Sequence, residues 1–435
     1  MVTCVWFYSI EFTQNICRFS LHSNQMQGPK KKKASSRRTR KNTDPVTLDF
    51  SPAAFREPLL TWYRENARLL PWRKGHNPYG TWLSEIMLQQ TRVATVIDRY
   101  RAFLHRFPTI AALAKAEESD VLALWSGLGY YRRARMLHRG AQFVERELNG
   151  EIPHTSTELR TLPGVGEYTA AAIASIAYGE STAVVDGNVE RVLLRILGLP
   201  EQRTTTARKH LSQVAQALVP PKAKKDSPAN PPGTHNQAMM ELGATLCLPR
   251  QPLCLHCPVV DFCKTRGEHV TAGRAPQQSR MAAHLLSVRK RSITTEVLLE
   301  RRAENASLMP GMLELPPLPV ETVLDREPVL RLRHSITNTN YYVQIFSEAA
   351  ANVPAEGKGK KKRRPSPGDE EDDELFVATG EEPSAYPSLR NEIPARAEAL
   401  EWHPVTRLND LPLTGLTRKV LHRLKLLTLP KIQVD

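Results

Sequence analysis

The chain has 435 residues, of which 41% are hydrophobic and 24% are charged, as is ordinary for globular domains. Its formal net charge of +15 is unusual and indicates a polyanionic partner, either nucleic acid or an acidic membrane surface. No apolar run is long enough to span a bilayer, and the first residues lack the basic start of a secretory signal. Membrane-spanning and secreted proteins are therefore disfavoured.

Residues 1–46 are expected to form a disordered basic arm. Within them, residues 28–43 hold eight Lys or Arg and almost no apolar side chain. Such a tail can be merely solvated, but its two basic clusters, Lys30–Lys33 and Arg37–Lys41, favour a nuclear-localisation signal that also attracts DNA. We therefore expect the protein in the nucleus, with the mitochondrion as a second compartment.

Residues 47–275 are predicted to form an all-α domain. Segments such as WLSEIMLQQTRVATVIDRYRAFLHRF repeat apolar residues every three or four positions, and Pro or Gly residues separate these segments. After a polar linker at 276–283, TTEVLLERR and YYVQIFSEAA are typical of short strands, and TRKVLHRLKLL is typical of a helix. Residues 284–430 are therefore expected to form a smaller α/β domain, interrupted at about 354–374 by a disordered insertion of charged blocks.

Four of the six cysteines lie close together, with the spacing Cys247-x6-Cys254-x2-Cys257-x5-Cys263. In a chain without a secretion signal, this density suggests a metal or cluster site rather than disulfide bonds. Structural zinc sites usually have two close pairs of cysteines, whereas here only one pair has the CxxC spacing. Four thiolates in one tight loop favour an iron–sulfur cluster, with zinc as the alternative.

The cysteine loop follows the segment HNQAMMELGATLC, and together they closely resemble the cluster loop of the endonuclease-III-like DNA glycosylases. The resemblance implies a [4Fe-4S] cluster, held by the four cysteines, with a structural and DNA-associated role. A second segment, LPGVGEYTA, resembles the helix-hairpin-helix motif of the same family. A Gly-x-Gly turn alone would suggest an ordinary turn between helices. The resemblance implies that main-chain N–H groups of Gly164, Val165 and Gly166 hold a DNA phosphate.

The string AVVDGNVERVLLR places Asp186 before a helix, where an Asp is commonly an N-cap. In this family the matching Asp faces the sugar of the target nucleotide, which implies catalytic roles for Asp186 and its neighbour Asn188. Bifunctional members carry a nucleophilic lysine two residues after the second Gly of the hairpin, where this chain has Tyr168. A phenol is a poor substitute for an amine, so we expect base removal without strand cleavage. Tyr168 and Asn188 are expected to hold Asp186 in place.

Glu85 has mainly apolar neighbours, where burial would raise its pKa and keep a proton on it near neutrality, although a helical Glu more often faces solvent. The string WLSEIMLQQT resembles the adenine DNA glycosylase branch of the family, the MutY type, in which this Glu lies in the adenine pocket. The strings LPWR and GLGYYRRAR resemble the pocket wall and the minor-groove wedge of that branch. The residues thereby implied to contact DNA are Trp72, Arg73, Gln90, Leu128 and Tyr130.

The partner implied by this resemblance is double-stranded DNA with A:8-oxoguanine or A:G mispairs. Glu85 would protonate N7 of adenine, and Asp186 would stabilise the oxocarbenium-like sugar, either electrostatically or by transient covalent attachment. Ionised Glu85 would then activate the water that completes hydrolysis.

The segment VLLERRAENASLMPGMLELPPL resembles, more weakly, the Nudix-like lesion-recognition domain of the same branch. No Glu-rich metal site of the Nudix hydrolases is found around ETVLDREPVL, so nucleotide hydrolysis is not expected. The string RHSITNTNYY places Thr337 where bacterial relatives have a Ser implied to contact 8-oxoguanine.

Two other functions fit part of this pattern. An endonuclease-III-type glycosylase/lyase for oxidised pyrimidines is disfavoured by Tyr168 and by the WLSEIMLQQT helix. A non-catalytic DNA-damage-binding protein is disfavoured because Glu85 and Asp186 are both present. We expect a monomer that makes no membrane contact and that meets replication or repair proteins.

Overall fold

The computed structural model describes residues 48–75, 77–201, 204–224, 227, 229–269, 276–306, 308–336, 338–348, 389 and 399–428. The basic arm up to residue 46 and the charged insertion at 354–374 lie outside these residues, so their expected disorder stays a prediction.

The described residues between 48 and 269 form helices and short turns and contain no strand, which confirms the all-α prediction for this region. The helices begin where the sequence supplies caps, as at Asn77 and Asp186, whose side chains accept a hydrogen bond from the first turn. The α-helices are α1 (Pro52–Asn66), α2 (Pro78–Leu88), α3 (Val93–Arg106), α4 (Ile110–Ala114), α5 (Glu118–Trp125), α6 (Arg132–Glu147), α7 (Ser156–Leu159), α8 (Glu167–Tyr178), α9 (Gly187–Leu197), α10 (Thr205–Leu218) and α11 (Pro231–Thr245).

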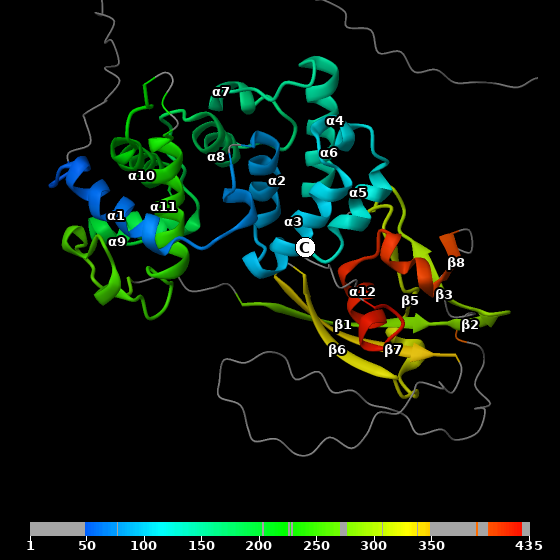
Figure 1. Cartoon of the computed structure of the whole chain (residues 1–435). Helices are drawn as coiled ribbons and strands as arrows, with labels where there is room; N and C mark the ends of the chain where they lie inside the picture. The colour runs from blue at the N-terminus through cyan, green and yellow to red at the C-terminus, as the bar shows by residue number, and fades with distance from the viewer. Residues whose placement is uncertain are drawn as a thin grey trace, which may run out of the picture. The chain divides into compact units, whose positions relative to one another are not determined.

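These helices pack around two separate apolar cores. One core lies among α2 to α8 and contains Trp82, Phe103 and Trp125. The other lies among α1, α9, α10 and α11, so the first helix packs beside helices from much later in the chain (Figure 1). Helix α8 contacts α2 of the first group and α11 of the second. The helical hairpin that ends in α8 therefore lies where the two groups meet.

Among its described residues, the C-terminal region contains two four-stranded sheets and one α-helix, α12 (Gly415–Arg423). One sheet has the order β5-β1-β7-β6, with β1 and β7 parallel and the other pairs antiparallel. In the other sheet β3 pairs with β2, β4 and β8. The strands are β1 (Gln278–Leu286), β2 (Val288–Arg291), β3 (Thr294–Arg301), β4 (Leu313–Glu314), β5 (Pro317–Leu318), β6 (Leu330–Ile336), β7 (Thr339–Ser347) and β8 (Leu400–Pro404).

The strand β1 begins inside the segment that was predicted to be a linker. Residues Gln278–Arg280 are polar and exposed, yet their backbone pairs with Thr339–Tyr341 of β7. Because this pairing uses only main-chain groups, the side chains carry no alternating apolar pattern that would have indicated a strand.

None of the helices in the described part of the chain combines the length and apolar character of a membrane span.

Candidate active site and DNA-contact surface

Glu85 lies on a helix that is buried along almost its whole length. Every residue of α2 from Tyr79 to Met87 is buried, and Glu85 is 4% exposed. Burial raises the pKa of its carboxyl to about 7, and the negative charge of Asp186 adds to the increase. The hydrogen bond from Tyr168 and the charge of Arg73 oppose it. Glu85 can therefore carry a proton at neutral pH.

Tyr168, the second residue of α8, donates its hydroxyl hydrogen to Oε2 of Glu85 across 2.6 Å. Burial and the two nearby carboxyls raise the pKa of this phenol well above its usual value of 10. Tyr168 is therefore a neutral hydrogen-bond donor. The sequence led us to expect that it would hold Asp186, whereas its hydroxyl bonds to Glu85.

Asp186 is the N-cap of α9, and both oxygens of its carboxylate accept hydrogen bonds. Oδ1 accepts from the backbone N–H of Val189 at 2.7 Å, and Oδ2 accepts from Nδ2 of Asn188 at 3.1 Å. The Asn188 side chain in turn accepts a hydrogen bond from Arg191 at 2.9 Å, and Arg191 also donates to the carbonyl of Cys247. The expected pairing of Asn188 with Asp186 is therefore present, and side chains connect it to the start of the cysteine loop.

Trp72 and Arg73 form a short 3-10 turn (Pro71–Arg73) before α2. The Trp72 ring is buried and meets the Tyr100 ring edge-on, with the ring centres 5.5 Å apart. Arg73 donates to Oε2 of Glu241 at 2.7 Å.

Glu241 was missed by the sequence reasoning. This α11 carboxylate also binds the Arg68 guanidinium, at 2.7 and 2.9 Å, and the two arginines lower its pKa to about 2. It thereby ties the segment that carries Trp72 to the second helical group. The position of Glu241 as a charged residue within the apolar string AMMELGA could have indicated a buried, paired carboxylate.

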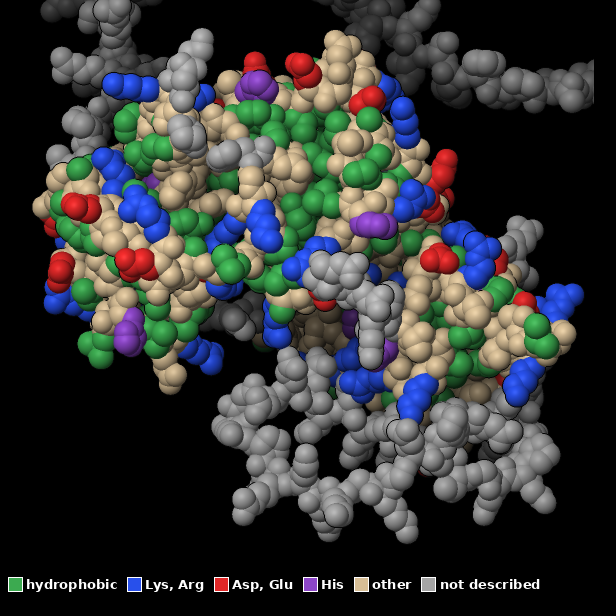
Figure 2. Space-filling model, viewed as in Figure 1, with side chains coloured by type: hydrophobic (Ala, Val, Ile, Leu, Met, Phe, Trp, Pro, Cys, Tyr) green, Lys and Arg blue, Asp and Glu red, His purple; other side chains and the backbone are tan. Residues whose placement is uncertain are grey.

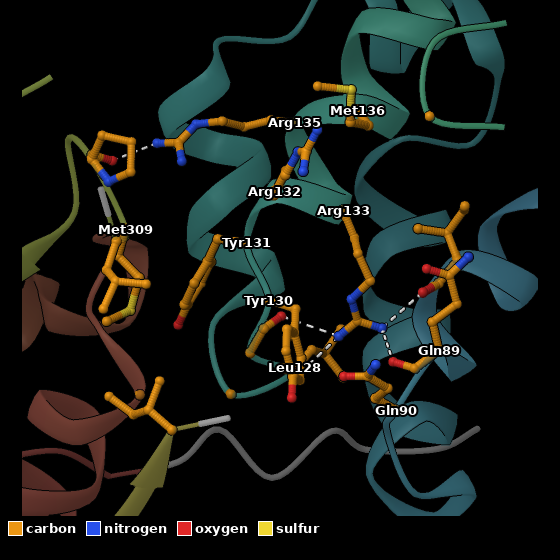
Figure 3. Close-up of a pocket in the computed structure, with 18 of the residues that line it drawn as sticks. Gln89, Gln90, Leu128, Tyr130, Tyr131, Arg132, Arg133, Arg135, Met136 and Met309 are labelled. Atoms are coloured by element: carbon orange, nitrogen blue, oxygen red, sulfur yellow. Dashed lines mark hydrogen bonds between the residues drawn. The ribbon is translucent and has the colours of Figure 1, made fainter. Parts of the chain in front are cut away.

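The residues expected to form the wedge meet at one cavity of about 1130 Å³, shown in Figure 3. Gln90, Leu128 and Tyr130 line it, and four arginines of α6 (Arg132, Arg133, Arg135 and Arg139) line it as well. Tyr130 is 48% exposed and available to a ligand, whereas Leu128 is only 4% exposed and contributes to the core. Glu85 and Asp186 do not line this cavity. The cavity is therefore separate from the two carboxyls, although Ile86, which follows Glu85 in α2, lines it.

The turn between α7 and α8 has the geometry that a phosphate site needs. Gly164 has φ +78°, and a Cβ added to it would lie 2.4 Å from the Cβ of Met136, so only Gly fits. Val165 is buried, and its N–H donates to the carbonyl of Leu162 at 3.1 Å, so the expected phosphate contact of this N–H is wrong. A Cβ on Gly166 would meet nothing within 4 Å. The N–H groups of Gly164 and Gly166 donate to no acceptor within the described residues. They and the first N–H groups of α8 are available to an anion.

The four cysteines lie on one loop and influence one another electrostatically. Burial raises the pKa of the Cys257 thiol to about 11, and the charges of Cys247, Cys263 and Cys254 add to the increase. Arg195 donates to Sγ of Cys247 at 3.3 Å, and the backbone N–H of Arg266 donates to Sγ of Cys263 at 3.4 Å. Across the described ranges, no three His, Cys, Asp or Glu side chains are grouped tightly enough to hold a metal ion.

Thr337 lies outside the described residues, so its expected contact stays a prediction. The residues just before it, His334, Ser335 and Ile336 at the end of β6, line the wedge cavity. This segment of the C-terminal region therefore reaches the same cavity as Tyr130.

Comparisons with known proteins identify one family model and several similar proteins. Residues 83–220 match the family model described as "HhH-GPD superfamily base excision DNA repair protein". The chain is 48% identical over 231 residues to a protein of Rattus norvegicus named "Adenine DNA glycosylase", covering 51% of this chain and 43% of that protein. It is 46% identical over 244 residues to the Homo sapiens protein of the same name, covering 54% and 42%. The chain thus spans less than half the length of these relatives.

Among solved structures, the chain is similar to a thermostable thymine-DNA glycosylase, with 28% identity and a TM-score of 0.44, over 49% of this chain and 96% of that one. A non-covalent endonuclease III–DNA complex matches with 22% identity and a TM-score of 0.40, over 50% and 97%. The family match covers Glu85, the hairpin and Asp186 together. Residues 83–220 of this chain are therefore similar to the HhH-GPD superfamily of base excision DNA repair proteins.

Proposed function

We propose that this chain is a monofunctional DNA glycosylase that hydrolyses the N-glycosidic bond of adenine opposite 8-oxoguanine or guanine in double-stranded DNA. One observation carries the proposal: Glu85 is buried, and burial raises its pKa to about 7, with a further increase from the charge of Asp186. The names of the relatives support adenine as the base.

The two carboxyls divide the reaction between them. Protonated Glu85 donates its hydrogen to N7 of adenine, so that the base leaves neutral while the C1′–N9 bond breaks. Positive charge then develops on the sugar, and the carboxylate of Asp186 stabilises it. Glu85, now ionised, accepts a proton from the water that adds to C1′, which restores the acid. The hydroxyl of Tyr168 orients Glu85 throughout, and Asn188 orients Asp186.

The absence of strand cleavage follows from Tyr168. A lyase reaction needs an amine that attacks C1′ and forms a Schiff base. The phenol of Tyr168 is neutral, and its hydrogen is committed to Glu85. This argues against the alternative of a glycosylase/lyase for oxidised pyrimidines.

Several parts of the surface suit a DNA duplex. The N–H groups of Gly164 and Gly166 suit one backbone phosphate, and the arginines of the wedge cavity suit others. Lys and Arg side chains, blue in Figure 2, border the hollow in the middle of the displayed face. Insertion of Tyr130 into the base stack would help to offset the cost of extruding adenine. The C-terminal sheets would serve as the Nudix-like lesion-recognition domain and would meet 8-oxoguanine near His334 and Thr337.

The four cysteines fit a [4Fe-4S] cluster. Their thiols lie on one loop and influence one another electrostatically, which supports one shared site, and Cys4 ligation is the usual ligation of such clusters. N–H groups of Arg195 and Arg266 already point at two of the sulfurs, as is usual around such clusters. When bound, the cluster would hold the loop 247–263 in a fixed shape.

We also propose a nuclear, monomeric enzyme that contacts other repair proteins.

The decisive test is a single-turnover assay on a duplex with one A:8-oxoguanine pair. The intact strand should remain after reaction and should break only on treatment with alkali. Glu85→Gln should abolish adenine release and leave duplex binding nearly unchanged. Full activity of that variant, or efficient trapping of a Schiff base by borohydride, would overturn the proposal.

The cluster has its own test, which does not depend on activity. The purified chain should contain iron and acid-labile sulfide in equal amounts, and Cys257→Ser should lose both. Cys17→Ser, outside the cysteine loop, is the control and should keep them. Zinc in place of iron in the wild-type protein would exclude the cluster.

A further inference from the structure

The loop Ser126–Tyr131, between α5 and α6, contains three residues at positive φ, and one of them is not a glycine. Gly127 and Gly129 have φ of +96° and +66°, and Tyr130 has φ +48°, which a side-chain-bearing residue rarely adopts. Such a loop keeps its shape only where neighbouring groups hold it. Because the loop presents Tyr130 to the wedge cavity, whatever holds the loop also places Tyr130.

The helical region holds this loop from one side. Arg133 donates to the carbonyls of Leu128 and Gly129 at 2.9 and 3.1 Å, and the Trp125 indole donates to the carbonyl of Gly129 at 3.2 Å. Figure 3 shows the Arg133 side chain reaching toward Leu128 and Gln89. These contacts fix the middle of the loop.

The C-terminal region holds both ends of the same loop. The carbonyl of Leu413, just before α12, accepts hydrogen bonds from the hydroxyls of Ser126 and Tyr131, each at 3.0 Å. Arg418 of α12 donates from Nε to the Ser126 hydroxyl at 2.7 Å. Ser126, Tyr131 and Arg418 are 0%, 3% and 6% exposed, so water does not compete for these bonds.

A buried arginine such as Arg418 is an energetically unfavourable residue with which to join two regions. Within the described part of the chain, Arg418 donates to the neutral side chains of Ser126 and Asn409, and its Nη2 is buried without an acceptor there. Burial and the nearby charge of Arg99 lower its pKa to about 10. A buried cation without a carboxylate adds little stability, and an apolar side chain of similar size would often serve stability better.

We propose that Arg418 and Ser126 are positioning residues through which the C-terminal region holds the wedge loop in the shape that inserts Tyr130 into DNA. The proposal rests on the proposed function and extends it. Contact of the C-terminal region with the strand opposite adenine would then influence the conformation of the loop that extrudes adenine. We call the contacts of Leu413 and Arg418 with Ser126 and Tyr131 the brace. Loss of the brace should slow the extrusion of adenine more than it weakens binding of the duplex.

The test uses the full chain in the Glu85→Gln background, with 2-aminopurine next to the target adenine to report extrusion. Arg418→Met and Ser126→Ala should each slow the fluorescence rise about tenfold and change the duplex Kd much less. Arg418→Lys keeps a donor and should restore part of the rate. Ser181→Ala is the matched control, because it removes a similar hydroxyl-to-carbonyl bond, to Pro220 at 2.9 Å, elsewhere in the chain.

Hydrogen exchange of the free protein tests the brace without any DNA. Amides of residues 127–130 should exchange faster in Arg418→Met and Ser126→Ala, and at the wild-type rate in Ser181→Ala. Unchanged exchange in both brace variants would overturn the proposal, as would equal effects in the control. If the wild-type chain releases no adenine, the proposed function fails, while the exchange result still decides whether the brace exists.

Discussion

The hydroxyl of Tyr168 donates to Oε2 of Glu85 across 2.6 Å, so the residue that stands where lyases have a lysine is bonded to the acid of the site. This bond favours the ionised carboxylate and lowers the pKa of Glu85, against the larger effect of burial. Tyr168 thus occupies the position where a lyase would need an amine, and it also lowers the pKa of Glu85, the proposed acid.

Tyr168→Phe should move the pH dependence of adenine release. Without the hydrogen bond, the pKa of Glu85 should rise above about 7, so the rate should begin to fall at a higher pH than in the wild type. Single-turnover rates between pH 5 and pH 9 measure this. Tyr178→Phe, on the same helix but bonded to the carbonyl of Ile152, is the control and should keep the wild-type profile. An unchanged alkaline limb in Tyr168→Phe would show that the bond does not adjust the acid.

Glu85→Gln should change how stability depends on pH. The pKa of Glu85 is about 7 in the folded chain and 4.5 when unperturbed, so its favourable contribution is complete below pH 4.5 and is lost as pH rises through about 7. At about 1.4 kcal/mol per pKa unit, the wild type should lose roughly 3 kcal/mol over this window, and Glu85→Gln should not. Urea unfolding of both proteins at pH 5 and pH 8 provides the comparison. Parallel pH dependences would mean that Glu85 ionises freely in the folded state.

Local patterns in the sequence predicted the helices well, because burial of one helix face repeats every three or four residues. They did not predict that β1 begins at Gln278, because that end of the strand is held only by main-chain pairing with β7. They also could not distinguish the buried Leu128 from the exposed Tyr130, which are two residues apart in one loop.

The site itself is not visible in local patterns. Glu85, Tyr168 and Asp186 come from three different helices or helix starts, and only the family resemblance indicated that they meet. The bond between Tyr168 and Glu85, and the role of Glu241, depend on how the helices pack. The contacts of Leu413 and Arg418 with Ser126 join residues 287 and 292 positions apart, for which no sequence spacing gives a signal.

Glu241→Gln should destabilise the helical region strongly. The carboxylate is fully buried and binds both Arg68 and Arg73, so its loss leaves two guanidinium groups without their partner. Removal of one member of such a buried network typically costs about 3 kcal/mol or more. Urea unfolding at pH 7 should show this loss, whereas Asp120→Asn, which breaks the exposed pair with Arg106, should change stability little. The pKa of Glu241 is lowered to about 2, so its contribution is present above pH 4.5 and is lost as pH falls toward 2. Equal effects of the two substitutions would mean that the Glu241 network is not structural.

The two glycines of the hairpin should respond differently to the same substitution. Gly164→Ala places a Cβ 2.4 Å from Met136 at φ +78°, so it should destabilise the fold by at least 1–2 kcal/mol, roughly the cost of a left-handed residue. Gly166→Ala meets nothing within 4 Å and should leave stability nearly unchanged. Its methyl group would nevertheless stand beside the N–H groups that suit a phosphate, so affinity for duplex DNA should fall and its salt dependence should become less steep. Thermal unfolding and binding titrations at two salt concentrations separate the effects. If Gly166→Ala binds duplex DNA as tightly as the wild type, the phosphate does not sit at this turn.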